Sequence, residues 1–227
     1  MQIVFHQRAL RRALFGVAAG VSIFGLVAEL LHQLVPSLRS PLLAFFSLSC
    51  EGNFPTWYAA LLLAGCGVSL LAIAAGARQS GAPLHRHWTF LGAVFLYMSL
   101  DEAVELHEHL GDLVELHGLL YFSWVVPAGV VVLLVGAAYL RLLRQLPPTT
   151  RWRFVLAGTL YVGGALVLEL PLGWWAERAG RDNLVYGLID WAEETLELGG
   201  ATLFLASLLG YLGETHGELR LAPPGER

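Results

Sequence analysis

Apolar residues along the chain are grouped into six long runs, separated by short stretches that carry arginine, acidic residues, proline and glycine. Each run is long enough to cross about 30 Å of hydrocarbon as an α-helix, which rises about 1.5 Å per residue. No run shows the two-residue alternation of a membrane β-barrel strand. The pattern therefore predicts an all-α, polytopic integral membrane protein with six transmembrane helices. The predicted spans are approximately 13–35, 55–77, 87–110, 119–141, 153–175 and 186–212.

The six runs predict a single six-helix transmembrane domain over 1–212, followed by a short polar tail over 213–227. Three arginines precede the first run, as they would in a signal peptide. Because the run is too long for a signal peptide and no small-residue cleavage site follows it, we expect this helix to be retained. The segment 41–50 is apolar but too short to cross a membrane, so it predicts an interfacial or re-entrant segment.

Composition supports a membrane protein and excludes some other classes. The chain is 56% apolar and 14% charged, whereas soluble domains average about 45–50% and about 25%. The net charge is −4 and lysine is absent, so no uniform basic surface is expected for a nucleic-acid partner. Cys50 and Cys66 belong to no CxxC pattern. This spacing predicts neither a disulfide framework nor a thiolate metal site.

The arginines predict the orientation of the chain. Three lie in the loops on one side of the predicted bundle, at Arg39, Arg178 and Arg181. By the positive-inside rule, the side that holds the remaining arginines faces the cytoplasm. We therefore expect both termini in the cytoplasm and the chain in a bacterial inner (plasma) membrane. The arginines on the cytoplasmic side are Arg8, Arg11, Arg12, Arg78, Arg86, Arg141, Arg144, Arg151, Arg153, Arg220 and Arg227.

Acidic residues inside the apolar runs are the strongest functional signal. Each costs about 2.5–3.5 kcal/mol at the centre of a membrane helix, so such residues normally face the interior of the bundle. The intramembrane acids of the third helix share an arc of roughly 120° with Glu108, His109 and Asp112. The intramembrane acids of the sixth helix share an arc of roughly 100° with Asp190. The intramembrane acids are Glu29, Asp101, Glu102, Glu105, Glu169, Glu193, Glu194 and Glu197.

Side-by-side carboxylates repel one another, and no arginine lies within these two stretches to neutralise them. Protons or a bound cation are the two candidates for this role. Carboxylates with imidazoles and no thiolate suit Fe, Mn or Zn, with Ca or Mg favoured if no histidine takes part. The predicted metal ligands are Glu29, His32, Asp101, Glu102, Glu105, His109, Glu169, Glu193, Glu194 and Glu197.

Glu29 and His32 form one E-x-x-H pair of the kind that di-iron helical bundles use twice. The second pair is missing, although Glu105 and His109 lie one helical turn apart and could substitute for it. Haem is disfavoured, because it would need His32 and His109 to face each other at one depth. Tyr161 and the tryptophans, Trp124 among them, are typical of the aromatic belt at a membrane interface.

Apart from His87, Arg141 and Arg153 at their very ends, the cytoplasmic halves of the predicted helices contain no ionisable group besides tyrosine and cysteine, so the polar cavity is expected to open outward only. This favours a metal-dependent enzyme that acts on a lipid or lipophilic substrate, with Glu105 and Glu194 as catalytic residues. Hydrolysis by metal-activated water and metal-centred redox chemistry both stay open. The alternatives are a divalent-cation transporter or sensor, and a non-catalytic membrane assembly subunit. The oligomeric state does not follow from the sequence.

Overall fold

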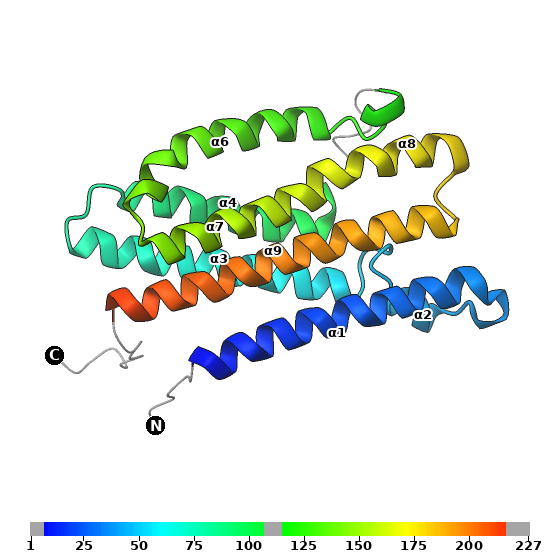
Figure 1. Ribbon diagram of the computed structural model, residues 1–227, viewed down its shortest axis with the longest axis horizontal. Helices are drawn as coiled ribbons and strands as arrows, with labels where there is room; N and C mark the ends of the chain where they lie inside the picture. Colours follow the sequence, from blue (N-terminus) through cyan, green and yellow to red (C-terminus); the bar gives the residue numbers. More distant parts are fainter. Residues whose placement is uncertain (1–6, 107–114, 217–227) are drawn as a thin grey trace.

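A computed structural model describes residues 7–106 and 115–216, which form helices and connecting turns and, within these ranges, no strand (Figure 1). The longest helices are α1 (Gln7–Leu34), α3 (Phe54–Gln79), α4 (His85–Val104), α6 (Val125–Gln145) and α9 (Leu184–His216). Three segments follow one another between α6 and α9, namely α7 (Pro148–Val162), η3 (Gly163–Leu168) and α8 (Glu169–Ala179). The short elements are η1 (Pro36–Leu38), α2 (Pro41–Phe46) and η2 (Gly118–Leu120).

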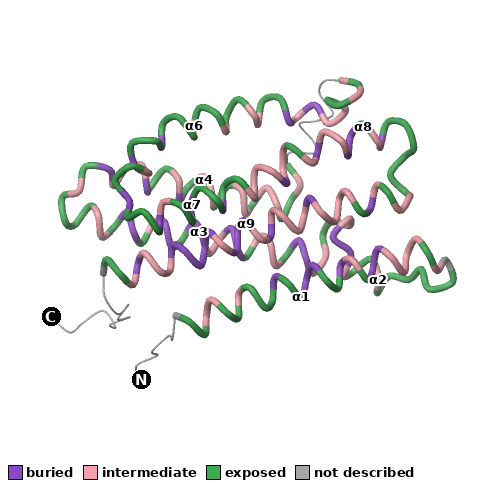
Figure 2. The backbone as a smooth tube through the Cα atoms, in the orientation of Figure 1, coloured by how far each residue is buried: buried purple, intermediate pink, exposed green. Residues whose placement is uncertain are grey.

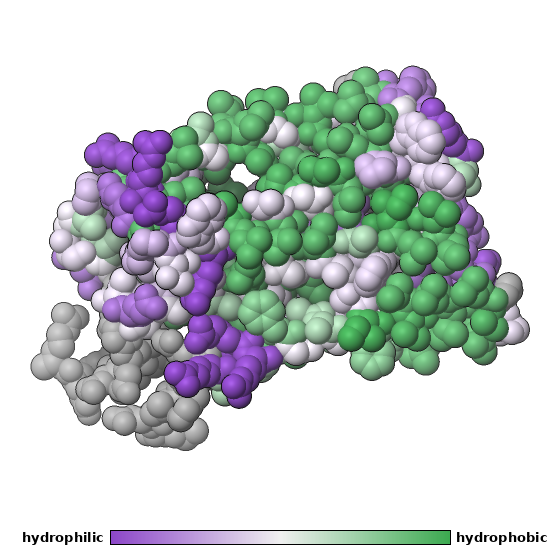
Figure 3. Space-filling model, viewed as in Figure 1, coloured by the Kyte–Doolittle hydropathy of each residue, from purple (hydrophilic) through white to green (hydrophobic). Residues whose placement is uncertain are grey.

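By length and composition, five helices of the described chain can cross a membrane. Four are α1, α3, α6 and α9, and the fifth is the continuous segment Pro148–Ala179 made of α7, η3 and α8. Figure 3 shows the corresponding surface, which is hydrophobic over its middle, with hydrophilic residues gathered at one end and along part of the other. The protein is therefore an all-helical, multi-pass membrane protein.

Helix α4 is apolar over most of its length but does not count among these five. Polar groups at both of its ends, from His85 to Glu102, lower its hydropathy. It runs along α3, and the two backbones approach closely where a Cβ on Gly67 would lie 3.1 Å from the Gly92 carbonyl oxygen. The helix predicted over 87–110 ends at Val104. Adjacent acidic groups disfavour the negative end of a helix dipole, which gives a physical reason for this early end.

Helix α9 is the central helix of the bundle and packs against α1, α3 and α7 (Figure 1). The buried side chains concentrate on α9 and α3, whereas α6 is exposed along most of its length (Figure 2). Leu70 and Cys66 of α3 and Leu208 of α9 are completely buried. This apolar core fills the bundle on one side of the acidic residues of α9.

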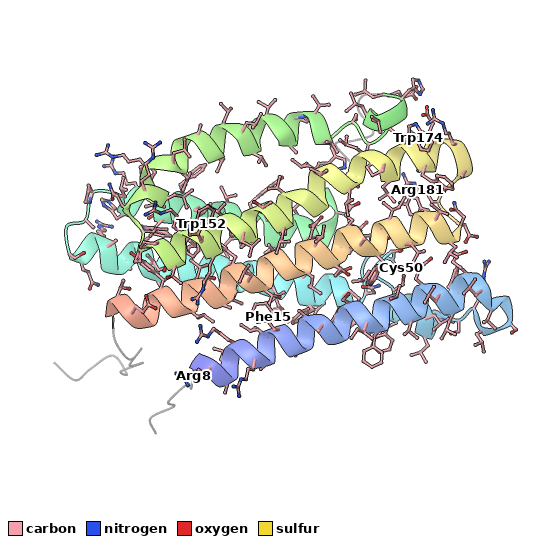
Figure 4. The ribbon with its side chains drawn as sticks, in the orientation of Figure 1. Arg8, Phe15, Cys50, Trp152, Trp174 and Arg181 are labelled. Carbon is pink, nitrogen blue, oxygen red and sulfur yellow. The ribbon has the colours of Figure 1, made fainter. Side chains whose placement is uncertain are left out.

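The two ends of the bundle differ in charge. We call the end that holds Arg8, Arg78 and Arg144 the arginine end; α1 begins there and α9 ends there (Figure 1). We call the other end, which holds Glu177 and Asp182, the acidic end. Figure 4 shows Arg8 and Trp152 near one end, with Trp174 and Arg181 near the other.

The segment 41–50, predicted to be interfacial or re-entrant, forms the short helix α2 and the loop that follows it. Asn53 fixes this loop at the start of α3. Its side-chain oxygen accepts a hydrogen bond from the Thr56 backbone N–H at 3.2 Å, and its amide donates to the Ser47 carbonyl oxygen at 2.6 Å. Pro55 then occupies the first turn, where a missing N–H costs nothing. The loop thereby brings Cys50 between α1 and α9 (Figure 4).

Candidate carboxylate site

Four acidic residues follow one face of α9 over about two turns: Asp190, Glu193, Glu194 and Glu197. Glu193 is buried, with 7% of its surface exposed, and the other three are half-buried. The charged groups that act on them across the bundle, within the described residues, are other carboxylates, chiefly Glu102, Glu169 and Glu51. Negative charge on this face therefore needs protons or a bound cation to balance it.

A small cavity lies beside this face, between α3, α4, α7 and α9. Its polar lining consists of Glu102 from α4, Tyr161 from α7, and Glu194 and Glu197 from α9. Ala59, Leu63, Leu198 and Ala201 complete the wall. Its volume of about 10 Å³ is roughly the room that one water molecule needs. We call this space the carboxylate cavity.

Tyr161 is oriented toward the carboxylates of the cavity. Its side chain lines the cavity together with Glu197, and the two groups lie close enough to interact electrostatically. Close packing of α7 on α9 places it there, since a Cβ on Gly200 would lie 2.7 Å from the Tyr161 backbone nitrogen. The sequence predicts Tyr161 in an interfacial aromatic belt, whereas the structure places it in the wall of the cavity. The neighbouring glycines of α9 were the signal that could have placed it at a helix contact.

Glu169 and Glu193 form a second group next to the cavity, which we call the carboxyl pair. The two side chains lie close enough to act on each other, and both are more than nine-tenths buried. A hydrogen bond between two carboxyl groups requires a proton on one of them. The Trp124 indole N–H also donates to Glu169 Oε1 at 3.1 Å, so Trp124 is a partner of the pair as well as an interfacial residue. The second oxygen of Glu193, Oε2, is buried without a hydrogen-bond partner.

The π-helical segment η3 sets the position of Glu169, which follows it directly. A π turn takes one residue more than an α turn, so it changes the face that the following residues present. Pro171 lacks the N–H that would bond to a carbonyl in this segment, which loosens the helix there. Gly164 brings η3 against α9, where a Cβ would lie 2.7 Å from the Glu193 carbonyl oxygen and 2.8 Å from Glu197 Cγ.

Helix α1 contributes Glu29 to the same face of α9 but directs His32 elsewhere. Glu29 is 5% exposed and lies against Gly187, where a Cβ would be 2.8 Å from Glu29 Cγ. The Gln33 amide donates to Glu29 Oε1 at 3.2 Å. His32 Nε2 lies 3.8 Å from Asp182 Oδ1, in the loop before α9. The E-x-x-H pair is therefore split between a buried carboxylate and a partly exposed histidine at the acidic end.

Direct hydrogen bonds fix α1 against α9 beside these acids. The Ser22 and Thr195 hydroxyls lie 2.7 Å apart, and the Trp191 indole N–H donates to the Ser22 carbonyl oxygen at 2.8 Å. The nearby thiol of Cys50 is half-buried, and this burial raises its pKa, with carboxylates such as Glu29 adding to the effect. Cys50 is therefore mostly uncharged at neutral pH and adds no negative charge to the cluster.

The remaining predicted ligands lie outside the cavity or outside the described residues. Asp101 is beside Glu102 but does not line the cavity. Glu105 follows the end of α4 in a left-handed conformation, with φ 57° and ψ 40°, so it leaves the helical face on which it was predicted. His109, together with Glu108 and Asp112, lies outside the described residues. The proposed pairing of Glu105 with His109 therefore involves a residue outside the described part of the chain and stays a prediction.

The predicted convergence of acids is formed in part. Glu102, Glu194 and Glu197 share the cavity, and Glu169 pairs with Glu193 beside it. Across residues 7–106 and 115–216, no three or more His, Cys, Asp or Glu side chains are arranged closely enough to hold a metal ion. The arrangement supplies clustered carboxyl and phenol oxygens around a space of ionic size.

Comparison with known families places the chain among proteins that share this span. Residues 13–212 match the model of a domain of unknown function (DUF8692). The chain belongs to the DUF8692 family. The matched region covers all five membrane-spanning candidates in whole or in large part, and every acidic residue of the site. Searches of the curated proteins and of the solved structures found no match.

Proposed function

We propose that this DUF8692 protein binds a divalent cation inside the membrane, at the carboxylate cavity. The observation that supports the proposal is the lining of the cavity: three carboxylates and one phenol from three helices, with no basic side chain among its lining residues. Carboxylates in an apolar bundle are costly unless a proton or a cation neutralises them, and such residues are functional by default. A cation that sheds most of its water would fit the small volume.

The oxygen-rich lining favours Mn²⁺, Ca²⁺ or Mg²⁺ over metals that need imidazole ligands. His32 lies beside Asp182, and His117 lies 2.8 Å from Glu177 at the acidic end. Neither histidine reaches the cavity. Fe and Zn, which the sequence analysis also allowed, would depend on His109. Side-chain movement toward the ion is part of the proposal, because metal binding and local folding are coupled.

We propose that α4 is the sixth transmembrane helix and that both termini are cytoplasmic. The 20 residues of α4 give a length of about 30 Å, which matches the hydrocarbon thickness. The arginine end would then face the cytoplasm by the positive-inside rule. In an inner (plasma) membrane, this orientation opens the carboxylate site toward the outer face.

The apolar core supports binding over transport. Between the cavity and the arginine end, the interior is filled by side chains such as Leu70, Phe204 and Leu208. An ion on that path would find no ligand to replace its hydration. A catalytic use of the ion, with Glu105 and Glu194 acting on a lipophilic substrate, stays a prediction from the sequence, as does a role in membrane assembly.

Metal content and Mn²⁺ titration of the detergent-purified protein test the proposal. We expect one bound ion per chain, with electron paramagnetic resonance reporting the Mn²⁺ affinity. Glu197→Gln removes a charged ligand while keeping its shape, so the affinity should fall by at least about tenfold, or about 1.4 kcal/mol. Glu214→Gln, on the same helix but exposed near the arginine end, is the matched control and should bind as the wild type does.

Two results would contradict cation binding at this site. One is a purified protein that takes up no stoichiometric divalent ion. The other is an unchanged Mn²⁺ affinity in Glu197→Gln, with circular dichroism confirming that the variant is folded. Protons would then be the counter-charge of the cluster.

A further inference from the structure

Helix α6 is buried at its two ends and only partly covered along its middle. The residues that face the bundle recur every three or four positions, as expected of one helical face. Those at the ends of this face are buried: Val125 at the start, and Tyr139 and Leu142 in the last turns. No residue from 126 to 138 is buried. The inward-facing residues of this middle section are Ala128, Val132 and Val135, all partly exposed, and of these Val135 also packs against the apolar core.

Specific contacts account for the two attachment points. Near the acidic end, Trp124 precedes α6 and donates its indole N–H to Glu169. Near the arginine end, the Tyr139 hydroxyl donates to the His87 carbonyl oxygen of α4 at 2.7 Å, and the two rings meet edge to face. Between these points, a Cβ on Gly129 or Gly136 would meet no atom within 4 Å.

The space-filling view shows the result of this arrangement. Figure 3 shows an opening between α6 and the helices below it, bordered by hydrophobic surface. The stretch from Val125 to Val135 is about 15 Å long at the α-helical rise of about 1.5 Å per residue, and one leaflet of the hydrocarbon core is about 15 Å deep. We call this space the α6 gap.

We propose that the α6 gap binds a hydrocarbon chain of a membrane lipid. The gap lies between α6 and the neighbouring helices of the bundle. The residues of α6 that face it are aliphatic, so water would be a poor occupant. It is continuous with the exposed apolar surface of α6, where Leu133 is 75% and Leu134 is 66% exposed. The surrounding lipid therefore reaches the gap without crossing any polar barrier, and one acyl chain matches its length.

The α6 gap lies beside the helices that carry the candidate site. Glu102 belongs to α4 and Tyr161 to α7, and Trp124 joins the start of α6 to the carboxyl pair. A lipid chain in the gap would place its polar end near one of the two attachment points of α6. The lipophilic substrate that the sequence predicts thus has an apolar site next to the carboxylate cavity. Occupancy of the gap does not itself depend on cation binding.

Photo-crosslinking in vesicles tests the proposal directly. The full chain is reconstituted into phosphatidylcholine vesicles that contain phosphatidylcholine with a mid-chain diazirine, irradiated, and mapped by mass spectrometry. We expect adducts on the inward-facing Val132 and Val135, as well as on the outward-facing Leu133 and Leu134. Adducts on the outward residues alone would overturn the proposal, because they would show α6 closed on the bundle.

A pair of variants separates a bound chain from general lipid contact. Val132→Trp fills the gap, so adducts at Val135 should fall several-fold while those at Leu134 stay unchanged. Leu133→Trp is the matched control on the outward face and should leave the adducts at Val135 unchanged. Equal adducts at Val135 in both variants would contradict a bound chain. Circular dichroism checks that each variant is folded.

A second copy of the chain is the competing occupant. In a Cys50→Ser background, Val132→Cys should stay monomeric on oxidation if lipid fills the gap, and efficient disulfide dimers would overturn the proposal. Mn²⁺ affinity is measured in the same vesicles. Absence of adducts on the inward-facing residues together with normal Mn²⁺ binding would reject the lipid site alone. Adducts on these residues without Mn²⁺ binding would reject only the cation site.

Discussion

Glu169 and Glu193 occupy an environment that two adjacent anions could not share. Both are buried, their carboxyl groups act on each other, and Trp124 donates to Glu169. A proton on either carboxyl group would remove one of the two charges and supply a donor for a hydrogen bond between them. At the scale of single residues, the pair shows how the protein keeps carboxylates inside an apolar bundle without a basic partner from the described chain.

Two replacements of Glu169 distinguish the contribution of its hydrogen bonds to stability from the contribution of its charge. In Glu169→Gln, the amide accepts from Trp124 and donates to Glu193, so we expect stability within about 1 kcal/mol of the wild type. In Glu169→Ala, both partners lose their hydrogen bond, and we expect a loss of about 1–3 kcal/mol. Unfolding in detergent, followed by tryptophan fluorescence, measures both. Equal destabilisation in the two variants would show that a carboxyl group itself is required.

The sequence correctly predicted which residues face the site only where a helix continued without interruption. The α9 face was predictable because its four acids keep helical spacing. Glu105 was misplaced because α4 ends before it, and a repulsive run of acids at a helix end carries no sequence signal as strong as proline or glycine. Tyr161 and Trp124 were assigned to the interface because aromatic residues at this depth are common there. Only the packing of α7 and α6 shows their polar contacts.

At the scale of elements, η3 is the segment that links the helix pair α7–α8 to α9. Its extra residue per turn and the missing N–H of Pro171 allow α8 to present Glu169 to Glu193. Pro171 accounts for a loosened helix at this point, and Gly164 allows the π segment to approach α9 closely. Helix limits differed from prediction by a few residues for the same reason, since caps and contacts decide where a helix ends.

Two neighbouring glycines test this contact. In Gly164→Ala, the new Cβ would lie 2.7 Å from the Glu193 carbonyl oxygen, so the helices must separate at a cost of about 1–3 kcal/mol. In Gly163→Ala, no atom lies within 4 Å of the new Cβ, and the better helix propensity should add up to about 1 kcal/mol. Thermal unfolding in detergent compares the two. A stabilised Gly164→Ala would refute tight packing of η3 on α9.

At the scale of the whole molecule, the orientation in the membrane decides which side supplies the site. Asp182→Cys at the acidic end and Ser80→Cys at the arginine end are a matched pair in a Cys50→Ser background. We expect an impermeant maleimide added to intact cells to label Asp182→Cys at once and Ser80→Cys only after permeabilisation, because the arginine end is proposed to be cytoplasmic. The reverse order of labelling would show that the orientation is opposite to the one proposed. The carboxylate cavity would then open toward the cytoplasm.

The small size of the carboxylate cavity would also govern how fast the proposed ion exchanges. A space of about 10 Å³ would admit an ion but not its hydration shell, so entry would have to wait for water to leave the metal. Mg²⁺ gives up its water reluctantly, whereas the larger Ca²⁺ accepts irregular ligand sets readily. Exchange would then be slowest for Mg²⁺, and the cavity would discriminate between ions of equal charge by rate before it does so by affinity.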